Sequence, residues 1–151
     1  MEGSSAFQFA VSTALSGRDF ATFPAHSLAM VRDDGAMDLY HGGLRARAAS
    51  GDILFDHVDY HHYWEQLLED VKPWSYMKFP FLRDLGPEDG WYRVGPLTRV
   101  TNCDFIPSAL AEQERREFLA FDDGSAARAT LGFHWARMIE MLHAAEVISG
   151  L

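Results

Sequence analysis

The chain has 151 residues, about the length of one domain, with 48% hydrophobic and 23% charged side chains. This composition is typical of a globular protein, and it excludes a wholly disordered or a fibrous chain. With 22 acidic against 13 basic side chains, the formal charge of -9 disfavours broad electrostatic binding to nucleic acid or anionic lipid. A single cysteine, Cys103, excludes an intramolecular disulfide and any all-cysteine metal site built by this chain alone.

No stretch approaches the roughly 18 uninterrupted apolar residues that a membrane-spanning helix needs, so we expect no membrane partner. The N-terminus lacks the basic segment of an export signal, because its first cation is Arg18. Together with the absence of paired cysteines, these features predict a reducing, cytoplasmic location.

Residues 1–26 are low in charge, are punctuated by Gly17 and Pro24, and are predicted to be a loosely specified lead-in. The apolar runs 27–32 and 36–40 flank Asp-Asp-Gly, which is a hairpin signal. A second hairpin is predicted for 44–48 and 53–58. The expected product is a small antiparallel sheet of short strands.

Apolar residues at helical spacing then predict a helix over 59–71, ended by Pro73. Extended segments are expected at 74–81 and 91–100, separated by a loop at 86–90. Two helices follow. Ser108 is the expected N-cap of the first, which runs to Phe121. The last carries an apolar stripe of Leu131, Trp135, Met138, Leu142 and Ala145. The predicted fold class is α+β, a small antiparallel sheet with amphipathic helices.

Four potential metal ligands are concentrated at His57, Asp59, His61 and His62. Imidazoles four residues apart on a helix can share one metal ion, but the glutamate that zinc proteases place beside the first histidine is absent. A solvated helix start with Asp59 as its N-cap is the favoured interpretation. A small histidine-ligated metalloenzyme is the weakest functional hypothesis.

Two further features contain residue types that bind metals or catalyse reactions in other proteins. Glu140 and His143 form one E-x-x-H pair, the unit that di-iron bundles use in duplicate, and a surface glutamate with a histidine near the stripe edge is favoured instead. Cys103 has no basic neighbour in sequence, so a buried, inert thiol is favoured over a Cys-His hydrolase. No dinucleotide, phosphate-loop or esterase motif is present.

Two segments combine aromatic residues with a proline and single cations, at 74–80 and 94–99. Their order and spacing resemble S-[WY]-x-K-x-P and V-G-P-L-[AT]-R of the large, catalytic subunit of nickel-iron hydrogenases, most closely the soluble cytoplasmic type linked to NAD(P). The resemblance extends over about Asp19 to Ile148. It implies that 27–151 is the central portion of such a domain. The motif positions expected as framework near the site are Tyr76, Lys78, Pro80, Gly95, Pro96 and Arg99.

The resemblance implies reversible hydrogen oxidation at a nickel-iron centre held by four cysteine thiolates, the soft ligands that such metals prefer. It also implies a small iron-sulfur subunit, and diaphorase subunits, as partners. Neither cysteine pair of the family is present here. We therefore expect no metal ligand and no catalytic residue in this chain, and no activity from it alone. The alternative is a non-enzymatic, metal-free interaction module with the same fold.

Overall fold

The computed structural model describes residues 23–124 and 127–150, so most of the predicted lead-in lies outside the described residues. The strands are β1 (His26–Val31), β2 (Gly43–Arg47), β3 (Ile53–Val58), β4 (Leu67–Val71), β5 (Lys78–Leu82) and β6 (Tyr92–Arg93). The helices are α2 (Gly86–Asp89), α3 (Pro96–Asn102), α4 (Ala109–Ala120) and α5 (Gly132–Ser149). Short 3-10 turns are η1 (Tyr60–Glu65), η2 (Arg83–Leu85) and η3 (Phe121–Gly124). The predicted α+β class is confirmed.

The main sheet has the strand order β3-β2-β1-β6. β2 pairs antiparallel with both β1 and β3, as the hairpin signals predict. β6 pairs parallel with β1, placing His26 opposite Tyr92. The sheet is therefore mixed rather than purely antiparallel, because the chain returns to it along β1 after a long excursion that includes β4 and β5.

The two predicted hairpins have different outcomes. The β2–β3 turn forms, and the Ala48 N–H donates to the Asp52 carbonyl at 2.8 Å. The turn after β1 also forms, with Gly35 at a φ of 85° that suits glycine. The strand predicted for 36–40 is wrong, since this segment makes only two isolated bridges, Met37 with Val31 and Ala36 with Phe105. The Asp38 carboxylate then accepts from the N–H groups of Tyr40 and His41, which turns the backbone away from β1.

The predicted helix over 59–71 is wrong. η1 is capped by Asp59, whose carboxylate accepts from the His61 N–H, but it contains a kink at His62. The next residues form β4, because each of its positions has an antiparallel partner in β5, from Leu67 opposite Leu82 to Val71 opposite Lys78. Non-local pairing with β5 overrides the helical spacing of the apolar residues here.

The prediction of an extended segment over 91–100 is also wrong for the residues after β6. Gly95 adopts a φ of 103°, and Pro96 takes the first position of α3, where its fixed φ suits a helix and its missing N–H costs nothing. The loop expected at 86–90 is instead the single-turn helix α2, with Pro87 in its first turn.

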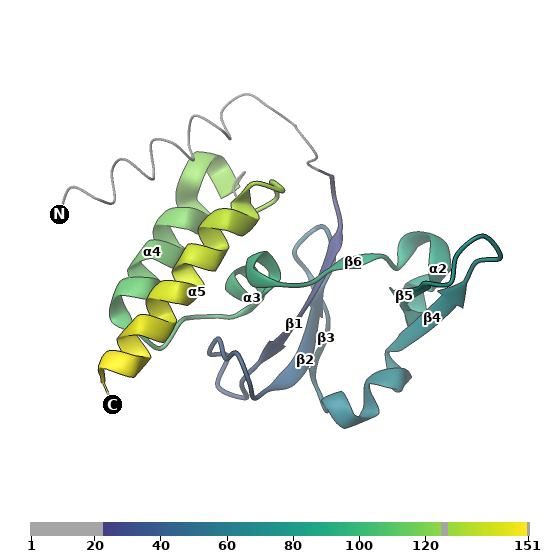
Figure 1. The fold of residues 1–151 in the computed structure, drawn as a ribbon, viewed down its shortest axis with the longest axis horizontal. Helices are drawn as coiled ribbons and strands as arrows, with labels where there is room; N and C mark the ends of the chain where they lie inside the picture. Colours follow the sequence, from purple (N-terminus) through teal and green to yellow (C-terminus); the bar gives the residue numbers. More distant parts are fainter. Residues whose placement is uncertain (1–22, 125–126, 151) are drawn as a thin grey trace.

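α4 and α5 lie side by side, and α3 lies between them and the sheet (Figure 1). Trp135 is 1% exposed and packs edge-on against Phe118 and Phe121. Met138, in the predicted stripe, is 47% exposed. The buried face of α5 is thus rotated from the predicted stripe and consists of Gly132, Trp135, Ala136, Ile139, Glu140 and His143. In the described residues, no helix is both long and apolar enough to cross a membrane.

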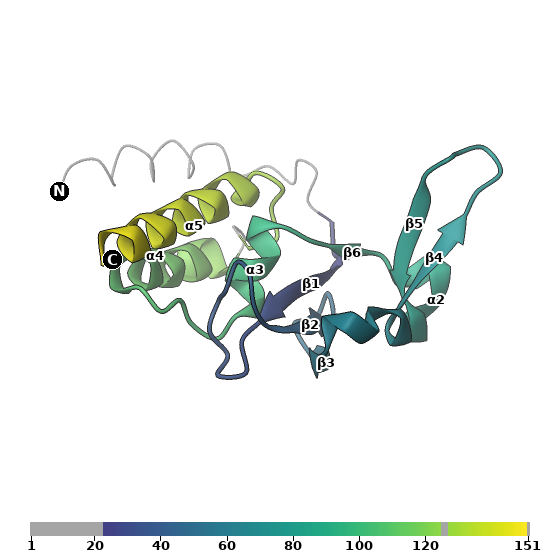
Figure 2. The ribbon, with the colours of Figure 1, turned by 60° about the horizontal axis from the view of Figure 1, so that its bottom comes forward.

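β4, β5, η1 and α2 form an arm that extends from the main sheet, away from α4 and α5 (Figure 2). Leu82 joins the arm to the sheet, since it is buried in one cluster with Leu28, Leu44 and Ala46. Large exposed side chains of the arm include Trp74 and Tyr76 in the turn between β4 and β5, and Trp91 just after α2. The molecule therefore has a well-packed helical end, formed by α3, α4 and α5, and a sparsely covered arm.

Candidate functional site

The second motif, residues 94–99, forms the start of α3 and joins the sheet to the helices. The Thr98 hydroxyl lies 3.1 Å from the Leu28 carbonyl of β1 and 2.9 Å from the Gly95 carbonyl, so it can donate to either. Leu97 and Thr98 are both 2% exposed. Since the Gly95 turn places Pro96 at the helix start, the motif fixes the direction in which α3 leaves the sheet.

Arg99 of this motif pairs with Glu140 of α5 in a two-point contact. Its Nε donates to Oε1 at 2.5 Å and its Nη2 to Oε2 at 2.9 Å. The Glu140 residue is only 8% exposed, whereas the Arg99 side chain is 30% exposed. Parallel hydrogen bonds of this kind fix the guanidinium plane. The contact contradicts the interpretation of Glu140 as a surface residue.

A small hollow of about 230 Å³ lies beside this ion pair. Its wall is mainly apolar, from β1, Leu44 and Val94, and its charged lining residues are Asp38 and Arg99. Gly95 also lines it. Two motif positions, Gly95 and Arg99, therefore line the same hollow.

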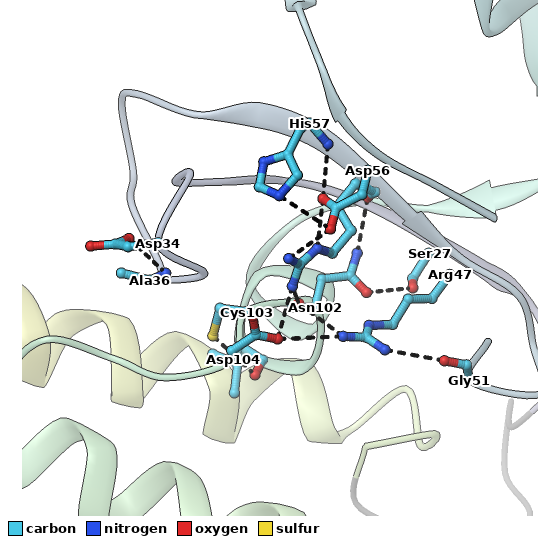
Figure 3. Close-up of polar contacts among 12 residues, drawn as sticks. Ser27, Asp34, Ala36, Arg47, Gly51, Asp56, His57, Asn102, Cys103 and Asp104 are labelled. Carbon is cyan, nitrogen blue, oxygen red and sulfur yellow. Dashed lines mark hydrogen bonds and ion pairs between the residues drawn. The ribbon is translucent and has the colours of Figure 1, made fainter. Parts of the chain in front are cut away.

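A second charged cluster connects the sheet to the end of α3 (Figure 3). Arg45, in the middle of β2, is 4% exposed. Its guanidinium contacts both oxygens of Asp56, at 2.9 and 2.8 Å, and donates to the Asn102 carbonyl and to Asp104, each at 2.9 Å. Every one of these contacts involves a charged partner or a carbonyl, so the buried cation is well satisfied.

The electrostatics of this cluster follow from its contacts. Burial acts to raise the pKa of Asp56, but hydrogen bonds from the Arg45 guanidinium and the His57 N–H outweigh it, so the pKa is lowered. The same pairing with Asp56 raises the pKa of Arg45 against the opposing effect of burial. Both groups are held in their charged forms.

The first motif, residues 74–80, lies in the arm rather than beside α3. Tyr76 is in the turn between β4 and β5 and is 99% exposed. Lys78 and Pro80 are on β5, and the Lys78 ammonium lies 2.7 Å from a Glu69 carboxylate oxygen on β4. α3 packs between β1 and α5, whereas β5 is part of the arm (Figures 1 and 2). The structure therefore does not bring the six predicted framework residues together.

The predicted histidine cluster is not assembled around a common point. His61 and His62 are exposed and face Asp59, while His57 lies beside Asp33 and Asp56. Within the part of the chain that the structure describes, no group of three or more His, Cys, Asp or Glu side chains could hold a metal ion. Asp59 acts as a cap, as predicted.

Cys103 is buried, 2% exposed, in the helical core. Burial raises the pKa of its thiol to about 11, although Arg115 opposes this effect. The predicted burial of the thiol is confirmed, and the raised pKa disfavours the thiolate, which is the reactive and metal-binding form. A lone thiol of this kind does not fit a nickel-iron centre held by four thiolates.

The structural contacts of three polar residues, His143, Glu146 and Arg45, were not predicted from the sequence. His143 lies 2.7 Å from the Ser108 hydroxyl, and Glu146 accepts from the Leu110 and Ala111 N–H groups at the start of α4. Ser108 is the N-cap residue, yet its hydroxyl makes no capping bond because it contacts His143. Strand alternation puts Arg45 on the face opposite Leu44 and Ala46, which would favour an exposed side chain, so its burial could not be predicted from the local pattern.

Comparisons with known proteins show that this chain is similar to parts of hydrogenase subunits. No protein-family model matches the chain. It is 45% identical to the beta subunit of the NAD-reducing hydrogenase HoxS of Cupriavidus necator over 132 residues, 87% of this chain and 27% of that protein. It is 40% identical to an F420-non-reducing hydrogenase subunit of Methanothermobacter thermautotrophicus, over 75% of this chain and 24% of that protein.

A crystal structure of an NAD+-reducing [NiFe]-hydrogenase in the H2-reduced state has a chain that matches 97% of this one. The TM-score is 0.89 and the identity 48%, and the match covers 33% of that chain. The present chain thus spans about a quarter of the length of the curated relatives and a third of the solved chain. It is related to hydrogenase subunits, which are oxidoreductases.

The comparisons correct the predicted subunit designation. The matching proteins are named as the HoxS beta subunit and as subunits of F420-non-reducing hydrogenases, and neither name designates a large, catalytic subunit. The predicted designation as a large, catalytic subunit rested on two short motifs and on resemblance in the flanking sequence. It is therefore replaced by similarity to these named subunits. The α+β fold itself agrees with the solved neighbour.

Proposed function

We propose that this chain is a structural part of a hydrogenase subunit, in an assembly that oxidises hydrogen reversibly and passes electrons to NAD(P) or a similar carrier. The observation that carries the proposal is the 48% identity and TM-score of 0.89 with a chain of an NAD+-reducing [NiFe]-hydrogenase. Iron-sulfur and diaphorase subunits are the expected electron-carrying partners.

Within that assembly the chain acts as framework. The Arg99–Glu140 pair joins α3 to α5, and the Arg45 cluster joins β2 to the end of α3. Paired buried charges of this kind fix one arrangement, because breaking a pair leaves a charge without compensation. The described residues do not fit a nickel-iron centre, so any such centre is held by other polypeptide, and this chain supplies no step through it.

The exposed aromatic side chains of the arm support partner binding. Trp74 is 74% exposed, Tyr76 99% and Trp91 65%. Aromatic residues are enriched in protein interfaces, and a concentration of them on an arm marks a surface that a partner covers. The arm is thus the proposed contact of this chain with the remainder of the assembly.

A chimeric protein tests the proposal. The matched segment of the Cupriavidus necator HoxS beta subunit is exchanged for the corresponding residues of this chain, and hydrogen-dependent NAD reduction is measured. We expect the chimera to assemble and retain activity, because the segment preserves the buried contacts. The matched control is the same chimera with Arg45→Met, which should lose assembly.

A second function, a metal-free interaction module, is favoured by the absence of a metal-binding group among the described residues. It predicts a chimera that assembles but neither takes up hydrogen nor reduces NAD. Metal analysis of the purified 151-residue chain provides an independent check. Stoichiometric nickel, with viologen reduction under hydrogen, would contradict both proposals.

A further inference from the structure

A larger hollow of about 600 Å³ lies on the side of α3 that faces the β2–β3 turn. Its lining comes from the start of β1, the end of β2, β6, α3 and the segment before α5. The volume is within the range of ligand pockets in proteins, about 300 to 1,000 Å³.

The charge of this hollow is opposite to that of the chain. Arg47, Arg93 and Arg128 line it, and no acidic residue is among its described lining residues. The whole chain carries a formal charge of -9. A concave site lined by one sign of charge concentrates ligands of the other sign, even on a protein whose net charge repels them.

Two of these arginines lack a countercharge among the residues that the structure describes. Arg93 donates through Nη1 to the Arg128 carbonyl at 3.0 Å and through Nη2 to the Phe23 carbonyl at 3.4 Å. Both acceptors are neutral, and burial lowers the pKa of Arg93. No ion pair joins Arg93 or Arg128 to a carboxylate whose position the structure describes. No described acidic residue therefore neutralises the charge of Arg93 or Arg128.

Arg47 is also incompletely satisfied. Its Nε is buried without a hydrogen-bond partner among the described residues. Its nearest carboxylate oxygen, on Asp104, is 3.7 Å from Nη2 and already lies 2.9 Å from Arg45. The other two nitrogens donate to neutral carbonyls, Nη1 to Gly51 at 3.2 Å and Nη2 to Asn102 at 3.5 Å. Arg47 therefore adds positive charge to the wall without a carboxylate partner of its own.

The Phe23 ring and the His26 side chain form a further part of the wall. The Arg93 guanidinium stacks on the Phe23 ring, 4.1 Å from its centroid, and this ring is more than half exposed. The His26 Nδ1 accepts from the Ala49 N–H, so its Nε2 carries the proton and donates to the Asp89 carbonyl. His26 is thus held as a rigid part of the wall, and the exposed Phe23 ring gives a planar apolar surface beside the cations.

We propose that this hollow is a binding site for a phosphorylated ligand with a planar aromatic body. Guanidinium groups match phosphate oxygens through parallel N–H donors, which favours phosphate among possible anions. The Phe23 ring and the apolar wall accommodate the aromatic part of the ligand. The site is inferred from lining residues of this chain alone and does not rest on the proposed function.

Calorimetric titration of the full chain at constant ionic strength tests the site, with adenosine 5′-monophosphate as probe. Adenosine and inorganic phosphate are titrated separately, to divide the contributions of ring and phosphate. We expect the monophosphate to bind, inorganic phosphate to compete with it, and adenosine to bind at least about tenfold more weakly, because charged hydrogen bonds are lost.

The test variant is Arg128→Gln, because the Arg128 guanidinium makes no hydrogen bond to other described residues and its loss should not disturb the fold. It should weaken monophosphate binding about tenfold or more. Arg137→Gln is the matched control, since Arg137 is an exposed arginine of α5 outside the hollow, and it should leave the affinity unchanged. Absence of binding, equal affinity for adenosine, or equal effects of the two variants would overturn the proposal.

Discussion

The helical end and the arm differ in which side chains they bury: charged side chains are buried near the helices, whereas aromatic side chains are exposed in the arm. Around α3, the charged residues Arg45, Arg115 and Glu140 are buried, and each has hydrogen-bonded partners. In the arm, Trp74 and Tyr76 are exposed. The difference shows that hydrophobicity alone does not decide burial in this chain. The buried charges are compensated by hydrogen-bonded partners within the chain, and the exposed aromatic residues form the proposed contact with the remainder of the assembly.

The largest expected effect comes from the aromatic centre of the helical end. Trp135→Ala should reduce the free energy of unfolding by about 4 kcal/mol, because a large cavity replaces a side chain that is 1% exposed. Chemical denaturation measures the loss. The matched control is Trp74→Ala in the arm, which should change stability by less than about 0.5 kcal/mol. Equal effects of the two substitutions would remove the contrast between the regions.

Arg45→Met should come next, with a loss of about 3 kcal/mol, since it leaves Asp56 and the Asn102 carbonyl without their buried donor. The same substitution at Arg32 is the control, because the Arg32–Asp34 pair is about half exposed. It should cost less than about 0.5 kcal/mol. A small loss from Arg45→Met would show that the cluster is not a structural link.

Glu140→Gln should destabilise by about 1 to 2 kcal/mol, because it keeps the volume of the side chain but removes the charge that Arg99 faces. Thermal unfolding would detect this as a lower melting temperature. Glu65→Gln in η1 serves as the control, since Glu65 is exposed, and its melting temperature should match that of the unmodified chain. A match for Glu140→Gln as well would contradict a role for the ion pair.

The smallest effect concerns pH. The pKa of Asp56 is lowered in the folded chain, so the unfolded state binds the proton more readily. The stabilisation from this group is present above the unfolded value, about pH 4, and is lost as the pH falls through the lower folded value. Asp56→Asn should therefore flatten the fall in unfolding free energy below about pH 4. An unchanged slope would indicate that other carboxylates dominate acid unfolding.

The sequence was sufficient where the signal is local. Asp-Gly and Ser-Gly-Asp punctuation predicted the turns after β1 and β2, the N-cap signal at Ser108 predicted α4, and helical spacing predicted α5. It failed over 59–71 because the apolar spacing there is compatible with a helix, and only pairing with β5 makes Leu67–Val71 a strand. The arm as a whole could not be predicted, since its strands depend on contacts across a turn of six residues.

For the candidate site as well, the sequence and the tertiary structure supplied different information. Composition and motif order were enough to point to hydrogenases and to exclude an all-cysteine metal site, because these conclusions need only residue identity and spacing. The designation of the subunit came from the comparisons, as two short motifs do not determine it. Only the tertiary structure paired Arg99 with Glu140 and Arg45 with Asp56, and only it left Arg93 and Arg128 beside one hollow. Ion pairs between distant segments depend on how helices pack on the sheet, which no local pattern in the sequence specifies.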